Sequence, residues 1–158
     1  MARGSFRSDF CARLWLGSVA ICAIGLTAPV LHAASLNEDS RAVKLADFFK
    51  EHHCPQPYLI SEYLRAADKY RIDYRLLPAV SVRESTCGMH ARWNNRWGWD
   101  SARTGFESLA RGIEFIARQL AQGRPYRGKS LDQKLHTYNP NPYYAKEVLQ
   151  LMRDIDSD

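Results

Sequence analysis

Several kinds of pattern are missing from this 158-residue chain. No stretch alternates apolar and polar residues for long enough to form a strand, and no segment repeats along the sequence. These absences exclude sheet-rich folds and repeat folds. Apolar residues recur instead at the spacing of amphipathic helices, so we expect an all-α domain of five to six helices.

Ligand pairs for a metal ion are also missing. His52, His53 and Cys54 are adjacent, but no second pair of ligands follows at the spacing of a metal site. Lysine and arginine are scattered rather than gathered in a stripe, and part of the formal net charge of +5 comes from arginines in residues 1–33. We therefore expect no metal, no cofactor and no nucleic-acid partner.

The N-terminal segment has the pattern of a secretory signal peptide. Three arginines precede an apolar run over residues 14–30, and small residues follow at Ala33 and Ala34. We predict that residues 1–33 are removed and that residues 34–158 form one domain, either periplasmic or secreted. An uncleaved N-terminal anchor is the alternative, and only in that case do we expect contact with a membrane.

Four cysteines are present, and two of them lie in the signal segment. The exported part keeps only Cys54 and Cys87, which in an oxidising compartment favours a disulfide over two free thiols. The bridge would close a loop of about 33 residues and stabilise the fold by roughly 3–4 kcal/mol in the chain-entropy model. It would also hold the chain close to Glu84.

Six helical segments follow from apolar spacing and from start and stop signals. We expect Asn37 or Ser40 to begin the first helix and Asp73 to cap the third. Capping boxes open two others, Thr104 with Glu107 and Ser130 with Gln133. The expected helices cover about 37–52, 58–71, 73–87, 104–122, 130–137 and 142–155.

Glu84 occupies an unusual position in the third of these segments. At 100° per residue it shares one face with Leu76, Leu77 and Val80, where an apolar side chain is expected. A carboxylate there must be paired, neutralised or directed into a cleft, because an unpaired buried charge is unfavourable. Burial also raises the pKa of a carboxyl group and makes it a usable general acid near neutral pH. The alternative is a solvated Glu84 on a helix whose phase differs by one residue.

Residues 86–105 follow neither helical nor strand periodicity and form a long loop. Every tryptophan after residue 33 lies in this loop, at Trp93, Trp97 and Trp99, together with Asn94 and Asn95. Indole faces stack on sugar rings, and amides hydrogen-bond hydroxyl and acetamido groups. Tryptophans can equally close a small core, and we expect at least one of them in each role.

Three short motifs in order resemble the lysozyme-like superfamily, in its lytic transglycosylase and glucosaminidase branch. They are Glu84-Ser85-x-x-Gly88, Asn94-Asn95-x-x-Gly98 and Tyr138-Asn139, and the resemblance covers residues 58–155. The chain departs from the family pattern because no Gly-Leu-Met-Gln stretch follows the Glu-Ser pair. The later turn reads Tyr-Asn-Pro, where the family has Tyr-Asn-Ala-Gly.

The resemblance implies cleavage of the β-1,4 glycan of peptidoglycan between N-acetylmuramic acid and N-acetylglucosamine, by a monomer. Glu84 would be the catalytic acid and then the base, with Tyr138 nearby. The implied glycan cleft is lined by Ser85, Asn94, Asn95, Trp97, Trp99, Tyr138 and Asn139.

The motifs leave the type of reaction open. A hydrolase with two carboxylates would need a partner for Glu84, and Asp100 is a better candidate than Asp132, which suits the first turn of a helix. A single-acid lytic transglycosylase is therefore favoured over a muramidase or glucosaminidase. A non-catalytic peptidoglycan-binding domain is a further alternative. The last is an envelope scaffold in which Glu84 forms an ion pair with Arg83 or Arg92.

Overall fold

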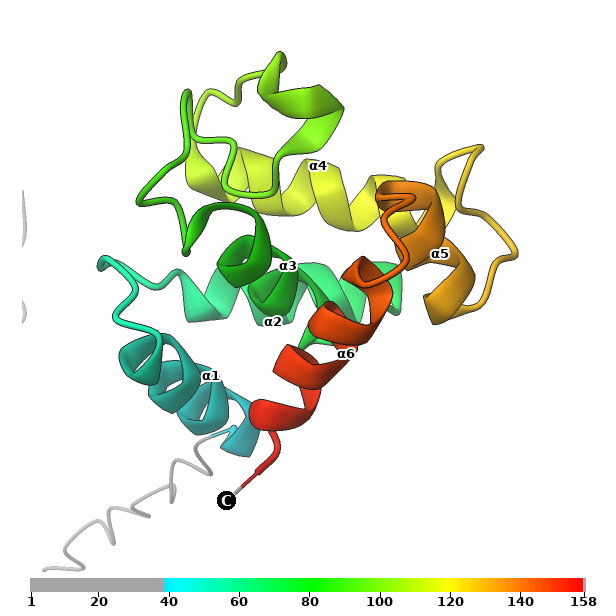
Figure 1. The fold of residues 1–158 in the computed structure, drawn as a ribbon. Coiled ribbons are helices and arrows are strands. Elements are labelled where there is room, and N and C mark those ends of the chain that lie inside the picture. The colour runs from blue at the N-terminus through cyan, green and yellow to red at the C-terminus, as the bar shows by residue number, and fades with distance from the viewer. Residues whose placement is uncertain (1–38, 158) are drawn as a thin grey trace, which may run out of the picture. The chain divides into compact units, whose positions relative to one another are not determined.

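The computed structural model describes residues 39–157, and this part of the chain is entirely helical, without strands (Figure 1). The all-α prediction is therefore confirmed, while the predicted signal peptide lies outside the described residues. None of the helices in residues 39–157 is long and apolar enough to cross a bilayer. Six α-helices and one short 3-10 helix are found: α1 Ser40–Glu51, α2 Ile60–Tyr70, α3 Leu76–Ser85, η1 Trp99–Ala102, α4 Leu109–Gln122, α5 Leu131–Tyr138 and α6 Tyr144–Asp154.

Helix α3 is the central element of the fold. It packs against α6 and α4, while α2 packs against α1 and α4, and α5 packs against α6 (Figure 1). The predicted face of Leu76, Leu77 and Val80 is buried, but Ala79 and Ser81 are also fully buried. Because α3 has neighbours on most sides, it is a core helix rather than a helix with one apolar stripe.

The helix starts show where local signals were correct. Ser130 and Gln133 form the predicted capping box at the start of α5. Asp39, rather than Asn37 or Ser40, caps α1 by accepting a hydrogen bond from the backbone N–H of Arg41. A short polar side chain next to free N–H groups is the common factor in both starts.

Two predicted helix starts are wrong. Thr104 does not cap α4, because the helix begins five residues later and Ser108 caps it by accepting from the N–H of Arg111. Asp73 accepts from the N–H of Arg75 in a turn that precedes α3, so it lies before the helix rather than at its cap.

The predicted disulfide between Cys54 and Cys87 is present, with the two Cα atoms 5.3 Å apart. Cys54 follows α1 and Cys87 follows the last residue of α3 by two positions. The bridge therefore ties the C-terminal end of α3, which carries Glu84, to the end of α1.

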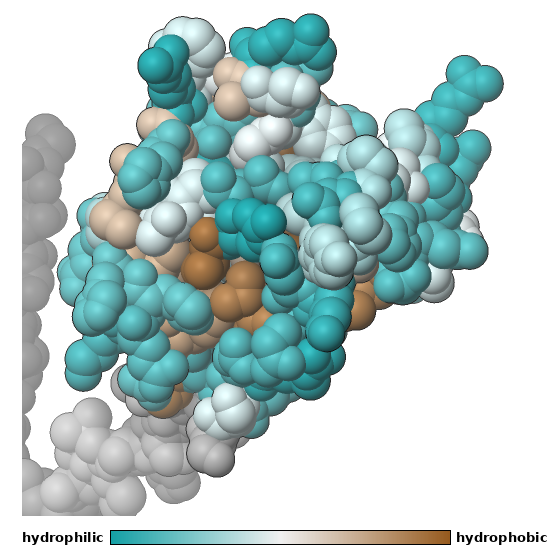
Figure 2. Space-filling model, viewed as in Figure 1, coloured by the Kyte–Doolittle hydropathy of each residue, from teal (hydrophilic) through white to brown (hydrophobic). Residues whose placement is uncertain are grey.

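The core reaches the surface only in places. On the face shown in Figure 2, apolar side chains form one limited patch where α1, α3 and α6 meet, and hydrophilic residues surround it. The buried apolar residues come from all six helices and also include Trp97, which belongs to the long loop after α3. The loop is therefore part of the core and not only a connection.

Removing the disulfide is expected to destabilise the fold. The double substitution Cys54→Ala and Cys87→Ala opens a loop with a sequence separation of 33, and should lower the free energy of unfolding by roughly 3–4 kcal/mol. Urea denaturation with and without a reductant measures this. The reductant should lower the stability of the wild type and leave that of the double variant unchanged. A wild type that the reductant does not destabilise would contradict a structural role for the bridge.

Candidate functional site

Glu84 lies in the last turn of α3, where the buried helix meets the loop. Its side chain is half-buried, and burial raises its pKa above the ordinary value of a glutamate. The nearby Tyr144 hydroxyl and the charge of Arg83 oppose this shift only in part. The carboxyl group therefore keeps its proton to a higher pH than a solvated glutamate, as a general acid requires.

Gly98 faces the Glu84 carboxyl at close range. A Cβ atom built on Gly98 would lie 2.6 Å from Oε2 of Glu84, and the backbone φ of Gly98 is +62°. Only glycine suits both the contact and this left-handed conformation. The backbone at Gly98 therefore forms one wall of the space around the carboxyl group.

Arg83 does not pair with Glu84, although it is adjacent in sequence. Its Nε donates to Oε2 of Glu147 on α6 at 2.5 Å. No ion pair of Glu84 with Arg92 or any other residue occurs within the described part of the chain. These contacts argue against the envelope-scaffold alternative, in which an ion pair would occupy Glu84.

Two tyrosines lie beside Glu84. The Tyr144 hydroxyl is the one buried side-chain polar atom within residues 39–157 that lacks a hydrogen-bond partner, and it is close enough to Glu84 for each group to shift the pKa of the other. The Tyr138 hydroxyl donates to the backbone carbonyl of Trp97, and its ring stacks on Tyr144 with centroids 6.1 Å apart. Burial raises the pKa of both tyrosines, and the charge of Glu84 adds to the effect.

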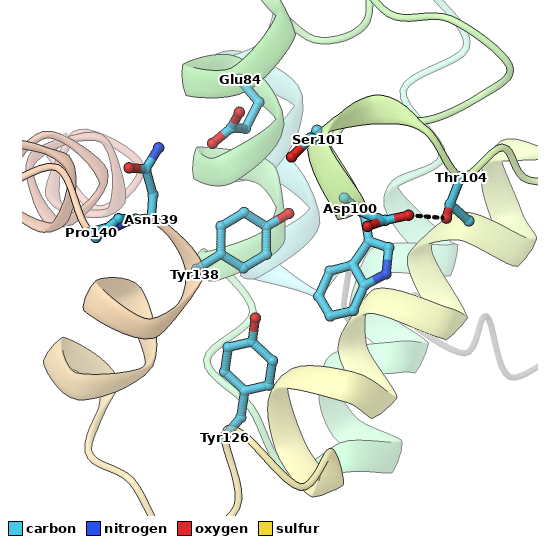
Figure 3. A pocket seen from close by; sticks show the side chains of 10 residues that line it. Glu84, Asp100, Ser101, Thr104, Tyr126, Tyr138, Asn139 and Pro140 are labelled. Atoms are coloured by element: carbon cyan, nitrogen blue, oxygen red, sulfur yellow. Dashed lines mark hydrogen bonds between the residues drawn. The ribbon is translucent and has the colours of Figure 1, made fainter.

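Glu84 lies where two hollows meet. The first has a volume of about 610 Å³ and the second about 530 Å³, and Glu84, Gly98 and Ser101 line both. Figure 3 shows Glu84 and Asn139 on one side of the first hollow and Ser101, Asp100 and Thr104 on the other. The remaining residues of the first hollow are Trp99, Tyr126, Tyr138 and Pro140. We call the two hollows together the groove, and Glu84 lies in the lining of both.

The wall opposite Glu84 has an unusual backbone. Asp100, Ser101 and Ala102 follow one another in the left-handed conformation, with φ between 53° and 59°. Non-glycine residues adopt this conformation at a cost of order 1–2 kcal/mol each. Such strain gathers at functional sites, where the surrounding structure enforces it.

The predicted glycan-binding residues separate into two groups. Trp99, Tyr138 and Asn139 line the first hollow. Trp97 does not line the groove, because its side chain is fully buried and its indole N–H donates to the carbonyl of Leu77 at 3.2 Å. The structure thus assigns one predicted tryptophan to the wall of the groove and another to the core.

Ser85, Asn94 and Asn95 hold the loop in position. The amide of Asn95 is 2 % exposed, and it donates to the carbonyls of Trp99 and Thr104 and accepts from the N–H of Trp99. The Asn94 amide donates to the carbonyls of Phe106 and Glu107. The Ser85 hydroxyl donates to the carbonyl of Arg96 and accepts from the N–H of Gly88. Ser85 and Asn95 also line the second hollow, while Asn94 lines neither hollow. These hydrogen bonds give the three side chains a role in holding the loop, and their predicted contact with glycan stays a prediction.

A second carboxylate is present in the first hollow. Asp100 accepts from Arg103 at 2.8 Å and from the Thr104 hydroxyl at 3.1 Å, and these two contacts hold its pKa below the ordinary range. Asp132 lines neither hollow and forms an ion pair with His136 at 3.6 Å. Among residues 39–157, Asp100 is therefore the one further carboxylate that lines either of these two hollows.

The prediction from sequence missed several residues of the groove. Tyr126 belongs to a connector between helices without any periodic signal. Tyr144 lies beside Glu84 without lining either hollow, and no motif pointed to it. Ser101, His90 and Arg92 carried no motif. Within residues 39–157, no group of three histidine, cysteine or acidic side chains is arranged to hold a metal ion.

In comparisons with known proteins, no family model, curated protein or solved structure matches this chain. The site must therefore be interpreted from its own geometry.

Replacing Gly98 with alanine should disturb the site in a specific way. The new Cβ would lie 2.6 Å from Glu84 Oε2, so the carboxyl group must move, and we expect a loss of stability of about 1–2 kcal/mol. Gly128 is a matched control, since its φ is +77° but no atom lies within 4 Å of a built Cβ. Thermal unfolding and an NMR titration of Glu84 in both variants measure the difference. Equal effects on the Glu84 pKa would show that Gly98 has no special contact with the carboxyl group.

Proposed function

We propose that this protein cleaves the glycan strands of peptidoglycan with Glu84 as the catalytic acid. One observation carries the proposal: a half-buried carboxyl group with a raised pKa lies where two hollows of a groove meet. A polymer in the groove would have residues on both sides of the carboxyl group. That arrangement suits the cleavage of an internal bond.

The first hollow has the side chains that sugars require. Trp99, Tyr126 and Tyr138 give the hollow an aromatic lining suited to the apolar sides of sugar rings, and Asn139 adds an amide suited to hydroxyl and acetamido groups. The resemblance of the Glu84-Ser85 and Tyr138-Asn139 motifs to the lysozyme-like superfamily supports the same substrate. A neutral or weakly charged polysaccharide is therefore the preferred ligand class.

The proposed reaction begins with the protonated form of Glu84. The acid donates its proton to the glycosidic oxygen as the bond to the muramic C1 breaks, and N-acetylglucosamine leaves with a free hydroxyl. The Glu84 carboxylate then accepts the proton of the muramic 6-hydroxyl, whose oxygen attacks C1 and closes a 1,6-anhydro ring. One carboxyl group serves both steps, and no water is consumed. An enzyme that follows this reaction is a lytic transglycosylase.

A hydrolase is the second candidate, and Asp100 favours it. Asp100 lines the same hollow as Glu84, and its hydrogen bonds keep it ionised, as a base or nucleophile must be. Against this role, Arg103 and Thr104 already bind its carboxylate. The single-acid reaction is the simpler account of the site.

Export to the periplasm or the exterior belongs to the same proposal. The disulfide between Cys54 and Cys87 is typical of proteins that fold in an oxidising compartment. Peptidoglycan lies outside the cytoplasmic membrane, so an enzyme that acts on it must be exported. The predicted signal segment over residues 1–33 fits this requirement.

Glu84→Gln is the direct test of the proposed function. It keeps the shape of the side chain but removes the acid, so the release of soluble fragments from purified cell walls should fall by at least about 100-fold. Glu107→Gln is a matched control, because Glu107 is exposed and lines neither hollow. Circular dichroism checks that both variants are folded. Full activity of Glu84→Gln would exclude the proposal, and cell-wall binding without release by the wild type would favour a binding domain.

Mass spectrometry of the released fragments distinguishes the two reactions. We expect 1,6-anhydro ends from the wild-type protein, and Asp100→Asn should keep most of its activity. Reducing ends together with an inactive Asp100→Asn would instead identify a two-carboxylate hydrolase.

The pH profile should depend on Tyr144. Activity requires protonated Glu84, so it should fall as the pH rises through the raised pKa of this residue. The Tyr144 hydroxyl favours the ionised carboxylate, so Tyr144→Phe should raise the Glu84 pKa further and move the alkaline limb to higher pH. Rates measured from pH 4 to 9 give the pH at which activity falls to half, and this midpoint does not depend on the maximal rate of each variant. Tyr143→Phe is the control, since Tyr143 is 69 % exposed and lines neither hollow. A limb that moves equally in both variants would contradict a direct effect of Tyr144 on Glu84.

A further inference from the structure

The two hollows that meet at Glu84 differ in charge. The first contains no basic residue and one carboxylate besides Glu84, that of Asp100. The second contains no carboxylate besides Glu84, and its basic residues are His90, Arg92 and Arg103. A strand in the groove would therefore meet the Asp100 carboxylate in one hollow and basic side chains in the other.

Arg92 is the cation in the second hollow that is available for a ligand. Arg103 is already bound to the Asp100 carboxylate at 2.8 Å. Neither Arg92 nor His90 forms an ion pair within residues 39–157, and both side chains are exposed. Arg92 therefore lines the hollow without a carboxylate partner in the described part of the chain.

The loop that carries Arg92 is held rigidly. The N–H of Phe106 donates to the carbonyl of Trp93 at 2.8 Å, and the N–H of Asn95 donates to the carbonyl of Arg92 at 2.9 Å, so the backbone at Arg92 adjoins a closed segment. The amides of Asn94 and Asn95 add four hydrogen bonds to backbone carbonyls across the loop. These bonds limit the movement of the loop backbone, so that binding orders mainly the Arg92 side chain itself.

We propose that the second hollow binds the acidic peptide stem of the substrate, with Arg92 as the specificity-determining residue. This inference rests on the proposed function. In peptidoglycan the muramic sugar carries a short peptide with free carboxylates, while N-acetylglucosamine carries none. A guanidinium binds a carboxylate through two parallel hydrogen bonds, which lysine or an amide cannot reproduce.

The proposed stem contact and the sugar contacts fall in different hollows. A carboxylate held at Arg92 lies in the second hollow, and Trp99 and Tyr138 line the first. The enzyme therefore selects glycan that still carries its peptides.

The test compares two forms of one substrate. Intact cell walls and walls stripped of peptides by an amidase are digested under identical conditions, and the ratio of the two kcat/KM values is the readout. The wild type should prefer intact walls, and Arg92→Gln should lower the ratio by about tenfold, as expected for the loss of one charge-assisted pair. Arg124→Gln should keep the wild-type ratio, because Arg124 is exposed and lines neither hollow. Added salt should reduce the preference of the wild type.

Co-sedimentation of Glu84→Gln with both wall preparations separates this inference from the proposed function. If the wild type releases nothing from either preparation, the proposed function fails. A preference of Glu84→Gln for intact walls that the added Arg92→Gln removes would still support the peptide-binding hollow. Equal wild-type activity on both preparations, or an Arg92→Gln variant that weakens both equally, would overturn it.

Discussion

The properties of Glu84 depend on the close approach of the loop after α3 to the end of that helix. Trp97 anchors the loop because its indole lies in the core and donates to the carbonyl of Leu77, one residue into α3. The next residue, Gly98, then meets the Glu84 carboxyl with no side chain between them. Burial of the carboxyl group, its raised pKa and the wall of the groove all follow from this single crossing. The disulfide at Cys87 holds the start of the same loop.

The parts of the molecule that were predictable from sequence are those with a local cause. Helical spacing and capping residues predicted the all-α fold and the start of α5, because these signals act within a few residues. The pairing of Cys54 with Cys87 followed from counting, since no other cysteine remained beyond the signal segment. Glu84 stood out because a carboxylate occupied an apolar position of a helix that the structure places in the core.

The remaining features depend on contacts between distant residues. Thr104 and Glu107 match a capping box, yet Phe106 between them joins the aromatic cluster, with its ring 6.2 Å from Trp97. The backbone at Phe106 is also bound to Trp93, so a helix cannot start there. A loop without periodicity gives no means of deciding which tryptophan faces the core. For this reason the core position of Trp97 could not be predicted from the sequence.

The burial that makes Glu84 a usable acid also has an energetic cost. Its pKa is higher in the folded protein than in the unfolded chain, so the folded state binds this proton more tightly. The stabilisation from the bound proton is complete below the ordinary carboxyl pKa, and it is lost as the pH rises through the raised pKa of the folded state. Above that raised pKa the fold carries an unfavourable charge that a glutamine would lack. Stabilising contacts elsewhere, such as the core position of Trp97 and the Cys54–Cys87 bridge, must offset the free-energy cost of this buried carboxylate. The stability of the fold and the acidity of the site therefore depend on each other.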